Sequence, residues 1–393
     1  MNAVRPGIDV LREDNFARLR GQRVGLMTNP AAVTHDLNST YRLLTDAPEV
    51  SVVALFAPEH GFAASAPDAE RIQHQTDART GLPVYSLYGE SYRPDAAMLH
   101  GLDVLVCDIQ DIGVRFYTFA WTVTHILEAA GEQGVRVMIL DRPNPLGGEK
   151  VAGPLLEPAL ASFVGRVPLP IVHGLTLGEL ARWFNAVWNP APAELDVIRC
   201  AGWQRTMRWP ETGLHWVGPS PNMPHLSTLW QYPGACLVEG TTLSEGRGTA
   251  LPFEVVGAPW IDGLVLADVL NAMAWGGVRF RPHVFQPTAS KWAGQTCYGV
   301  QAHLTDIDHW RPVETWLGVI QVIHGLYPAP FGWLPPQTDG VEPGTVYHFD
   351  RLMGSETYRH GIENGVSWER LTAGWDADSQ QFRRDVAAYL LYE

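Results

Sequence analysis

Polar side chains that could do acid–base or binding chemistry follow directly after four apolar runs of this sequence. Carboxyl groups can donate or accept protons, and an arginine can bind a carboxylate through two parallel hydrogen bonds. The apolar runs are residues 24–27, 52–56, 104–107 and 135–140. The side chains that follow them are Asn29, Glu59, His60, Asp108, Asp111, Asp141, Arg142 and Asn144. We therefore expect one active site where the four runs end.

Buried parallel strands would bring these side chains together. Continuous β-branched runs separated by helical stretches are typical of such strands, and an open α/β sheet binds its ligand beyond their carboxyl ends. Helices are predicted after the first run, where 38–40 can form a cap, and after the third, over 116–133 up to Gly134. The order predicts an α/β fold with a Rossmann-like, mostly parallel sheet. No GxGxxG motif follows any run, so a dinucleotide site is not expected.

Glu59 and His60 directly follow the second run. A carboxyl group held at a strand end beside the apolar Phe56 and Phe62 could have the raised pKa that a general acid needs. The alternative is that Glu59 only caps the next turn and that His60 is an ordinary structural histidine. Both interpretations stay open on this evidence.

Asp108 and Asp111 lie three residues apart, with Arg115 close behind. If this loop turns helically, the two carboxylates share a face. They could then act as a base, accept hydrogen bonds from sugar hydroxyls or form half of a metal site. The alternative is a buried pair of Asp111 with Arg115 that orders the loop.

Two further loops contain an arginine among turn-forming residues. In 141–148, the residues before Pro143 and Pro145 are restricted to extended conformations, which would fix Arg142 and Asn144. This loop could receive a carboxylate or could be a purely structural turn. Segment 239–249 combines two carboxylates, an arginine and three glycines but lacks the lysine of a P-loop. A polyol ligand suits it better than a phosphate, because its two acids would repel a phosphate.

Composition limits the classes of partner. The 393 residues carry a net charge of −14, from 28 basic and 42 acidic residues, which disfavours nucleic acid. Apolar residues make up 46% and charged residues 18%, as in globular proteins, and no apolar run approaches the length of a membrane span. The first residues contain no apolar signal region, so we expect a cytoplasmic protein.

Neither the histidines nor the cysteines have the spacing of metal ligands. The 14 histidines form no HxH or HExxH motif, and the four cysteines form no CxxC motif. We therefore predict no metal and no cofactor. A metal-dependent hydrolase that uses His60, Asp108 and Asp111 remains the rival hypothesis, and loss of activity in a chelator would favour it.

The second half of the chain has a different character. Residues 199–260 are rich in loop formers and tryptophan, and a stretch of this length with little periodicity is uncommon unless it is functional. Beyond it we predict helices over 262–275, 313–326 and 382–391 and a strand over 297–304. We expect a catalytic domain at 1–225 and a smaller α+β domain at 226–393 that contributes to the active-site cleft.

The same segments resemble the DUF1343 family over nearly the whole chain. The resemblance rests on the order and spacing of residues 7–11, 25–30, 58–61, 108–118, 141–145, 219–224 and 239–248. Characterised members of that family are exo-β-N-acetylmuramidases of the NamZ type, which release N-acetylmuramic acid from the non-reducing ends of peptidoglycan fragments. The resemblance implies a Rossmann-like domain with a smaller C-terminal domain, and it implies that Glu59, in the PEHG segment, is catalytic.

Under this hypothesis the partner is a muramic-acid-terminated disaccharide or peptidoglycan fragment. Glu59 would protonate the leaving oxygen, and either Asp108 would activate water or the 2-acetamido group of the substrate would attack. Arg142 or Arg247 would bind the lactyl carboxylate, because an anion needs a fixed cation in so acidic a protein. A non-catalytic sugar-binding module is the remaining alternative, and the density of strand-end carboxylates argues against it. The predicted substrate-binding residues are Asn29, His60, Asp111, Arg115, Tyr117, Arg142, Asn144, Asn222, Glu239, Glu245 and Arg247.

Overall fold

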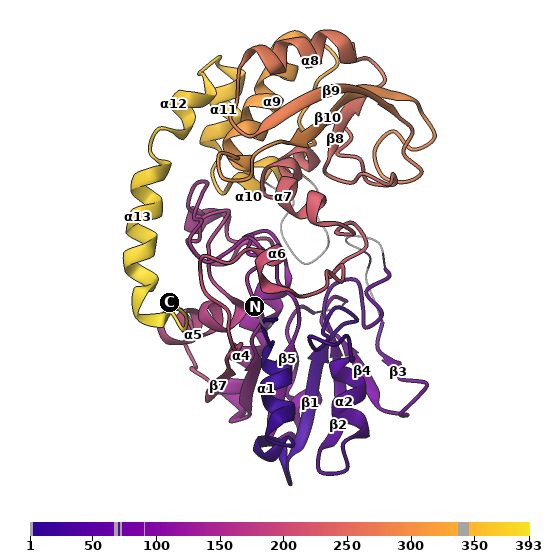
Figure 1. The fold of residues 1–393 in the computed structure, drawn as a ribbon, viewed down its shortest axis with the longest axis vertical. Coiled ribbons are helices and arrows are strands. Elements are labelled where there is room, and N and C mark those ends of the chain that lie inside the picture. The colour runs from indigo at the N-terminus through magenta and orange to yellow at the C-terminus, as the bar shows by residue number, and fades with distance from the viewer. Residues whose placement is uncertain (1–2, 67–69, 71–72, 90, 337–345) are drawn as a thin grey trace. The chain divides into compact units, whose positions relative to one another are not determined.

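The computed structural model describes residues 3–66, 70, 73–89, 91–336 and 346–393, and the chain forms two compact units. Unit 1 consists of Met1–Lys150, His173–Pro224 and Arg384–Glu393, and unit 2 consists of Val151–Val172 and His225–Arg383 (Figure 1). The chain therefore passes from one unit to the other after residues 150, 172, 224 and 383. A division into domains near residue 225 stays a prediction.

Within the described residues, a seven-stranded sheet forms the centre of unit 1, in the order β3-β4-β2-β1-β5-β6-β7. Its parallel strands are β1 (Arg23–Thr28), β2 (Ser51–Ala57), β4 (Pro83–Ser86), β5 (Val104–Asp108), β6 (Arg136–Leu140) and β7 (Leu195–Ile198). The short strand β3 (Gln75–Thr76) pairs antiparallel with β4. The predicted mostly parallel sheet is confirmed.

The order of the strands reverses between β1 and β5. The chain runs from β1 to β2 and β4 on one side and later places β5, β6 and β7 on the other side of β1. Thr28, the last residue of β1, pairs with Asp108, the last residue of β5. Such a reversal is where open α/β sheets bind their ligands, because the loops there leave in opposite directions. The segments that follow β1 and β5 therefore occupy the expected position for a site.

Helices pack against this sheet in unit 1. Helices α1 (Gly7–Glu13) and α2 (Thr40–Asp46) share a hydrophobic core with the strands, in which Ile8 and Leu44 contact the layer that contains Leu26 and Val106. Helices α4 (Phe119–Gln133) and α5 (Leu177–Val187) pack against each other and against β6. The helix predicted up to Gly134 is confirmed, and Gly134 ends it in a left-handed conformation with φ of 69°. Two short helices, α3 (Ala96–Leu99) and α6 (Trp209–Thr212), complete the unit.

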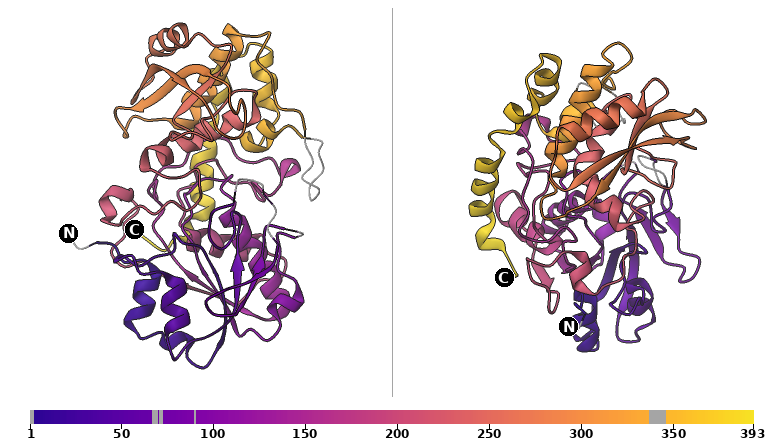
Figure 2. Two further views of the ribbon diagram at one scale, coloured as in Figure 1. Left: turned by 90° about the vertical axis from the view of Figure 1, so that its right-hand side faces the viewer. Right: turned by 45° about the horizontal axis from the view of Figure 1, so that its top comes forward.

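Unit 2 is a smaller α+β assembly, as predicted. Its described part contains a three-stranded antiparallel sheet of β8 (Val255–Ala258), β10 (Cys297–Leu304) and β9 (Val278–Phe285), in that order. Strands β9 and β10 pair over eight positions. Figure 2 shows the two strands side by side in orange. The strand predicted over 297–304 and the helices predicted over 262–275 and 313–326 are confirmed. The helices are α7 (Leu226–Ala235), α8 (Gly263–Ala272), α9 (Pro312–Leu326), α10 (His348–Met353), α11 (Thr357–Glu363) and α12 (Trp368–Thr372).

The C-terminal segment departs from the prediction. A helix over 382–391 was expected, but α13 (Trp375–Val386) starts earlier and gives way to the 3-10 helix Ala387–Tyr389. The reason is that side chains of α5 form hydrogen bonds with the backbone of residues 389–391. Arg182 Nη1 donates to Tyr389 O at 2.9 Å, and Leu391 N donates to Glu179 Oε1 at 2.8 Å. These bonds replace the helical bonds that the last turn would have made.

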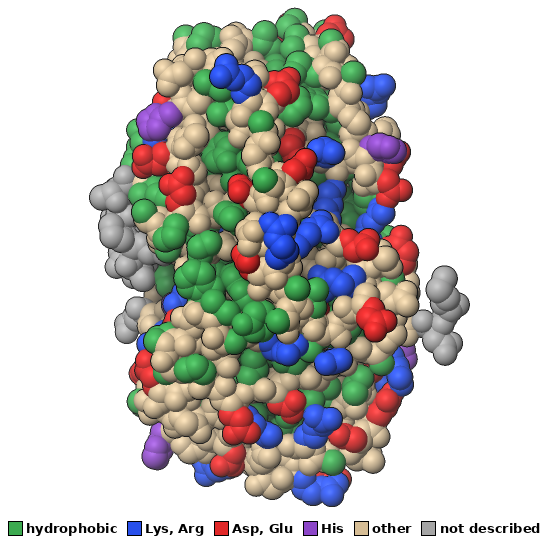
Figure 3. Space-filling model, turned by 90° about the vertical axis from the view of Figure 1, so that its left-hand side faces the viewer, with side chains coloured by type: hydrophobic (Ala, Val, Ile, Leu, Met, Phe, Trp, Pro, Cys, Tyr) green, Lys and Arg blue, Asp and Glu red, His purple; other side chains and the backbone are tan. Residues whose placement is uncertain are grey.

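The surface fits the overall composition. Basic and acidic side chains are interspersed on the face shown in Figure 3. No helix in the described part of the chain is both long and apolar enough to cross a membrane.

Candidate active site

Glu59 is held by a residue from another element. It follows β2, is only 6% exposed, and its Oε2 accepts a hydrogen bond of 2.6 Å from Thr118 Oγ1. Thr118 is the residue directly before α4. The end of β2 and the start of α4 therefore meet at this carboxyl group.

His60 closes the turn that follows Glu59. Its backbone adopts φ of 68°, which is uncommon for a residue other than glycine, and its carbonyl accepts from the N–H groups of Ser65 and Ala66 at 3.1 and 3.2 Å. Nδ1 lies 2.9 Å from the carbonyl oxygen of Ala66. Because a carbonyl oxygen can only accept, Nδ1 must carry the hydrogen, and Nε2 of the neutral ring is then an acceptor.

Asp108 and Arg142 form a buried ion pair at the ends of β5 and β6. Arg142 donates from Nε to Asp108 Oδ1 at 2.5 Å and from Nη2 to Oδ2 at 3.0 Å. Thr40 Oγ1 adds a third donor to Oδ2 at 2.5 Å, and Arg142 Nη1 donates to Val33 O at 2.9 Å. Asp108 is 0% exposed and Arg142 is 4% exposed. This geometry favours a positioning role for both residues, because both carboxylate oxygens and three guanidinium nitrogens already have protein partners.

Asp111 and His173 are a second buried pair. Asp111 Oδ2 accepts from Gly113 N at 2.7 Å and lies 4.0 Å from His173 Nε2. Neither Asp111 Oδ1 nor His173 Nε2 has a hydrogen-bond partner among the described residues. His173 Nδ1 accepts from Leu175 N at 3.1 Å, so the neutral ring carries its hydrogen on Nε2.

Burial favours the uncharged form of both side chains. It raises the pKa of Asp111 to about 7 and lowers the pKa of His173 to about 3. Both groups are therefore neutral over the range between these values. Buried polar atoms without partners are rare in folded proteins and often indicate a functional position.

Two asparagines hold the neighbouring loops. Asn29 donates to Pro219 O at 3.1 Å and accepts from Ala31 N at 3.0 Å, so it connects the end of β1 to the 219–224 loop. That loop contains Asn222, which is half-buried. Asn144 donates to Leu175 O at 2.9 Å and accepts from Leu146 N at 3.0 Å.

Asn144 also explains why position 113 is a glycine. Gly113 has φ of 76°, and a Cβ atom there would lie 2.4 Å from Asn144 Nδ2. A side chain at position 113 would therefore disturb both the turn that contains Asp111 and the loop that contains Asn144.

Arg115 and Tyr117 lie in the segment between Asp111 and α4. Arg115 is 1% exposed, and its carbonyl accepts from Trp121 Nε1 at 2.6 Å. Tyr117 is 6% exposed, and its ring meets Phe119 edge-on, with 4.9 Å between centroids. Both side chains belong to the interior of unit 1, next to the first turn of α4.

The predicted residues of segment 239–249 form a charged cluster of their own in unit 2. Arg247 donates to Glu239 Oε1 from Nε at 2.8 Å and from Nη2 at 2.6 Å, and its Nε lies 3.6 Å from Glu245 Oε1. Lys291 Nζ lies 2.8 Å from Glu245 Oε2, and His348 Nε2 lies 3.7 Å from Glu239 Oε2. Although burial opposes it, the charge of Arg247 together with His348 lowers the pKa of Glu239 to about 2. Glu239 is therefore an ionised carboxylate that is paired with neighbouring cationic side chains.

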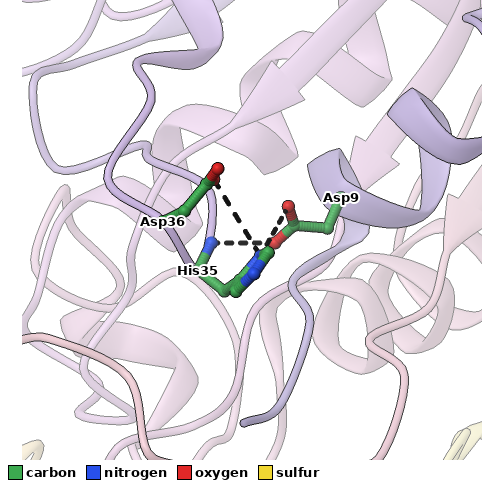
Figure 4. Close-up of side chains that lie close together, drawn as sticks. All are labelled: Asp9, His35 and Asp36. Atoms are coloured by element: carbon green, nitrogen blue, oxygen red, sulfur yellow. Dashed lines mark hydrogen bonds and ion pairs between the residues drawn. The ribbon is translucent and has the colours of Figure 1, made fainter.

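A group of possible metal ligands lies elsewhere in unit 1. Asp9, His35 and Asp36 are the one set of this kind within the described residues, and their side chains converge in Figure 4. However, Arg12 Nη2 lies 3.0 Å from Asp9 Oδ1, and Arg12 Nη1 lies 3.3 Å from Asp36 Oδ1. The guanidinium group of Arg12 already supplies positive charge to both carboxylates, so this group carries no assignment as a metal site.

The structure gives the predicted strand-end residues of unit 1 partners of their own, and Thr118 and His173 are two such partners that were not among the predicted site residues. Thr118 and His173 lie in segments where neither periodicity nor composition distinguishes them from structural residues. A third addition concerns Asp141, which accepts from Gly178 N and Thr176 Oγ1, both at 2.8 Å, and from Tyr392 OH at 2.6 Å. Burial raises the pKa of Asp141 to about 6. Such long-range partners are visible only in the folded chain.

Known proteins resemble this chain over its full length. Models of the exo-β-N-acetylmuramidase NamZ family match residues 24–227 for the N-terminal part and 230–392 for the C-terminal part. The peptidoglycan β-N-acetylmuramidase NamZ of Bacillus subtilis (strain 168) is 44% identical over 389 residues, which cover 99% of this chain and 91% of that protein.

Two solved structures of DUF1343 family proteins from Bacteroides fragilis NCTC 9343 also match. They superpose with TM-scores of 0.90 and 0.76 at 37% and 30% identity, and each comparison covers 100% of this chain and 99% of the other. The chain belongs to the NamZ family of exo-β-N-acetylmuramidases.

Proposed function

We propose that this protein is an exo-acting β-N-acetylmuramidase that hydrolyses the β-1,4 bond after a non-reducing terminal N-acetylmuramic acid in peptidoglycan fragments. Its place in the family makes it a glycoside hydrolase. The observation that carries the site assignment is the buried carboxyl group of Glu59, which follows β2 and is held by Thr118 at the start of α4. The expected physiological role is turnover and recycling of cell-wall material.

Glu59 is the proposed general acid. As the bond between the anomeric carbon and the leaving oxygen breaks, the proton of Glu59 passes to that oxygen. A water molecule then adds its oxygen to the anomeric carbon, and the proton lost by the water passes to a base. The base is either a second carboxylate or, after attack by the 2-acetamido group of the substrate, Glu59 itself in its ionised form.

For the second carboxylate we favour Asp111 over Asp108. Asp108 already accepts three hydrogen bonds from Arg142 and Thr40, and a proton on its carboxylate would weaken its buried ion pair with Arg142. Asp111 has one oxygen without a partner among the described residues, and burial raises its pKa to about 7, close to neutral pH. Asp108 then has the role of fixing Arg142 at the ends of β5 and β6.

For the lactyl carboxylate we favour Arg247 over Arg142. Arg142 is 4% exposed and donates from all three of its nitrogens to Asp108 and Val33 O. Arg247 donates to Glu239 from Nε and Nη2, but its side chain is 13% exposed, and Lys291 adds a second cation next to Glu245 in the same cluster. A carboxylate of the substrate could therefore join the Arg247 cluster without stripping Asp108 of its buried counter-ion.

Two further properties belong to the proposed function: the location of the protein and the ligands that the reaction needs. We propose a cytoplasmic location, which is supported by four buried cysteines that are all free thiols. We also propose that the reaction needs neither a metal nor a cofactor, and that nucleic acid is not a partner of so acidic a chain.

The test of the function is product analysis. The protein is incubated with a disaccharide that has N-acetylmuramic acid at its non-reducing end, and with the isomer that has N-acetylglucosamine there. Release of N-acetylmuramic acid from the first substrate alone is the expected result. Cleavage of internal bonds in longer glycans, or no release, would contradict the proposal.

A further inference from the structure

Thr118 occupies the N-cap position of α4, but its side chain does not cap the helix. A threonine at this position ordinarily accepts a hydrogen bond from a backbone N–H of the first turn, a bond that stabilises the helix by about 1 kcal/mol. Here the hydroxyl group donates to Glu59 Oε2 at 2.6 Å. The missing cap follows from the backbone of Thr118, which is already helical with φ of −71° and ψ of −16°, and the hydroxyl group is directed to the strand-end carboxyl group instead.

Another helix of the same unit shows the ordinary arrangement. Thr176 is the N-cap of α5, and its Oγ1 accepts from Glu179 N at 3.2 Å as part of a capping box. The two helices thus begin with the same residue type, but only α5 uses it as a cap. The two residues differ in backbone conformation, because Thr176 is extended with ψ of 166° whereas Thr118 is helical with ψ of −16°.

The surroundings strengthen the contact between Thr118 and Glu59. Both residues are buried, at 8% and 6% exposure, and a hydrogen bond to a carboxylate is stronger in such an environment than in water. The contact lies at the N-terminal end of a helix of 15 residues, where the helix dipole also favours negative charge.

We propose that Thr118 is a positioning residue for the reaction: its hydroxyl group fixes the orientation of the Glu59 carboxyl group and sets the pH range in which that group can transfer its proton. This inference rests on the proposed catalytic role of Glu59.

The experiment is the pH profile of kcat/KM for Thr118→Val, measured on the muramic disaccharide. Valine keeps the shape but lacks the donor, so the ionised form of Glu59 becomes less favourable. We expect a loss of about tenfold at the optimum, mainly in kcat rather than KM, and a shift of about one pH unit upward in one limb of the profile. A shift of the alkaline limb means that Glu59 must be protonated, and a shift of the acidic limb means that it must be ionised. Either shift supports the positioning role.

Two further variants separate this role from a structural one. Thr118→Ser keeps the donor and should restore the wild-type profile. Thr122→Val is the matched control, because Thr122 is buried one turn further along α4 and its hydroxyl group donates to the carbonyl of Thr118. It should leave both limbs in place.

The outcome that overturns the inference is a folded Thr118→Val protein with both limbs where the wild type has them. Glu59→Gln distinguishes this result from a failure of the proposed function. If Glu59→Gln is inactive while Thr118→Val has an unchanged profile, Glu59 is catalytic but Thr118 does not position it. If Glu59→Gln is active, the proposed role of Glu59 itself is wrong.

Discussion

His173 Nε2 lies 4.0 Å from Asp111 Oδ2, and both side chains are buried in unit 1. Burial moves the pKa of the two groups in opposite directions, to about 7 for Asp111 and to about 3 for His173. Both residues therefore make the free energy of unfolding depend on pH. Between about pH 4 and pH 6.5 a rise in pH lowers the contribution of Asp111 and raises that of His173.

The first prediction concerns the stability of Asp111→Asn. In the wild type, the raised pKa of Asp111 contributes stability that is fully present below its unfolded pKa, near 4, and is lost as the pH rises through about 7. The variant lacks this loss. The free energy of unfolding of the variant minus that of the wild type should therefore increase by on the order of 2–4 kcal/mol as the pH rises from 4 to 7. Denaturant titrations at several pH values measure the difference.

His173→Asn is the matched comparison for that experiment. Because the pKa of His173 is lowered, the wild type loses stability as the pH falls from about 6.5 towards 3. The free energy of unfolding of His173→Asn should therefore increase relative to that of the wild type as the pH falls. Differences that do not vary with pH in either variant would contradict the burial of two neutral groups.

The second prediction concerns Glu59→Gln. Glutamine keeps the size of the side chain and can accept from Thr118, but it has no acidic proton for the leaving oxygen. Turnover of the muramic disaccharide should fall by about 10² or more with the fold intact. Circular dichroism and a thermal unfolding curve verify the fold, and near-native turnover in a folded variant would remove Glu59 from the catalytic role.

The third prediction concerns the buried pair of Asp108 and Arg142. Arg142→Ala leaves the Asp108 carboxylate buried with only Thr40 as a described donor from a side chain, so we expect a loss of about 3–5 kcal/mol in the free energy of unfolding. Arg5→Ala is the control, because Arg5 pairs with Glu13 where both side chains are about half exposed, and it should cost less than about 1 kcal/mol. Equal losses would mean that the buried pair has no special weight.

The fourth prediction concerns substrate choice. Arg247→Ala should lower kcat/KM for the muramic disaccharide by about 2–4 kcal/mol, the range for a charged hydrogen bond that is partly buried. It should have little effect on an N-acetylglucosaminide that lacks the lactyl group. Arg142→Ala is measured in parallel, under conditions where it is folded. Selective loss in Arg142→Ala alone would move the lactyl contact to that residue, and equal losses on both substrates would show that neither arginine reads the lactyl group.

The fifth prediction is that a strong chelator leaves the rate unchanged. The candidate ligands Asp9, His35 and Asp36 already have Arg12 as a counter-charge, and His60 uses Nδ1 to hold its own turn. Dialysis against a chelator followed by assay with and without divalent ions is the measurement. Activity that is lost and then restored by an ion would favour the metal-dependent mechanism.

The sequence predicted the sheet because the strands follow from local patterns, whereas the place of the site stays a prediction. Apolar runs of strand length identify β1, β2, β5 and β6, and their ends deliver Asn29, Glu59 and Asp108 without any knowledge of tertiary contacts. The resemblance to a known family implied that Glu59 is the catalytic acid, because the PEHG segment keeps its position along the chain.

The partners of these residues could not be predicted in the same way. Thr118 lies 59 residues from Glu59, and Arg142 lies 34 residues from Asp108, so each contact depends on how two separate loops pack. The sequence suggested Arg115 as a partner for Asp111, and that pairing stays a prediction; the structure places His173 Nε2 at 4.0 Å from Asp111 Oδ2, from a segment without periodicity. The end of α13 was missed for a related reason, because Glu179 and Arg182 of α5 bind the backbone that the helix would have used.

Two segments that lie far apart in the sequence meet at Asp141. Tyr392 OH donates to Asp141 at the end of β6, across 251 positions, and Glu393 O accepts from Arg205 N at 2.8 Å. During synthesis the β6 loop is made long before its tyrosine donor, so every shorter form of the nascent chain has this loop without that support. A chain that lacked Tyr392 would keep all the strands of the sheet and yet leave a buried carboxyl group short of one donor.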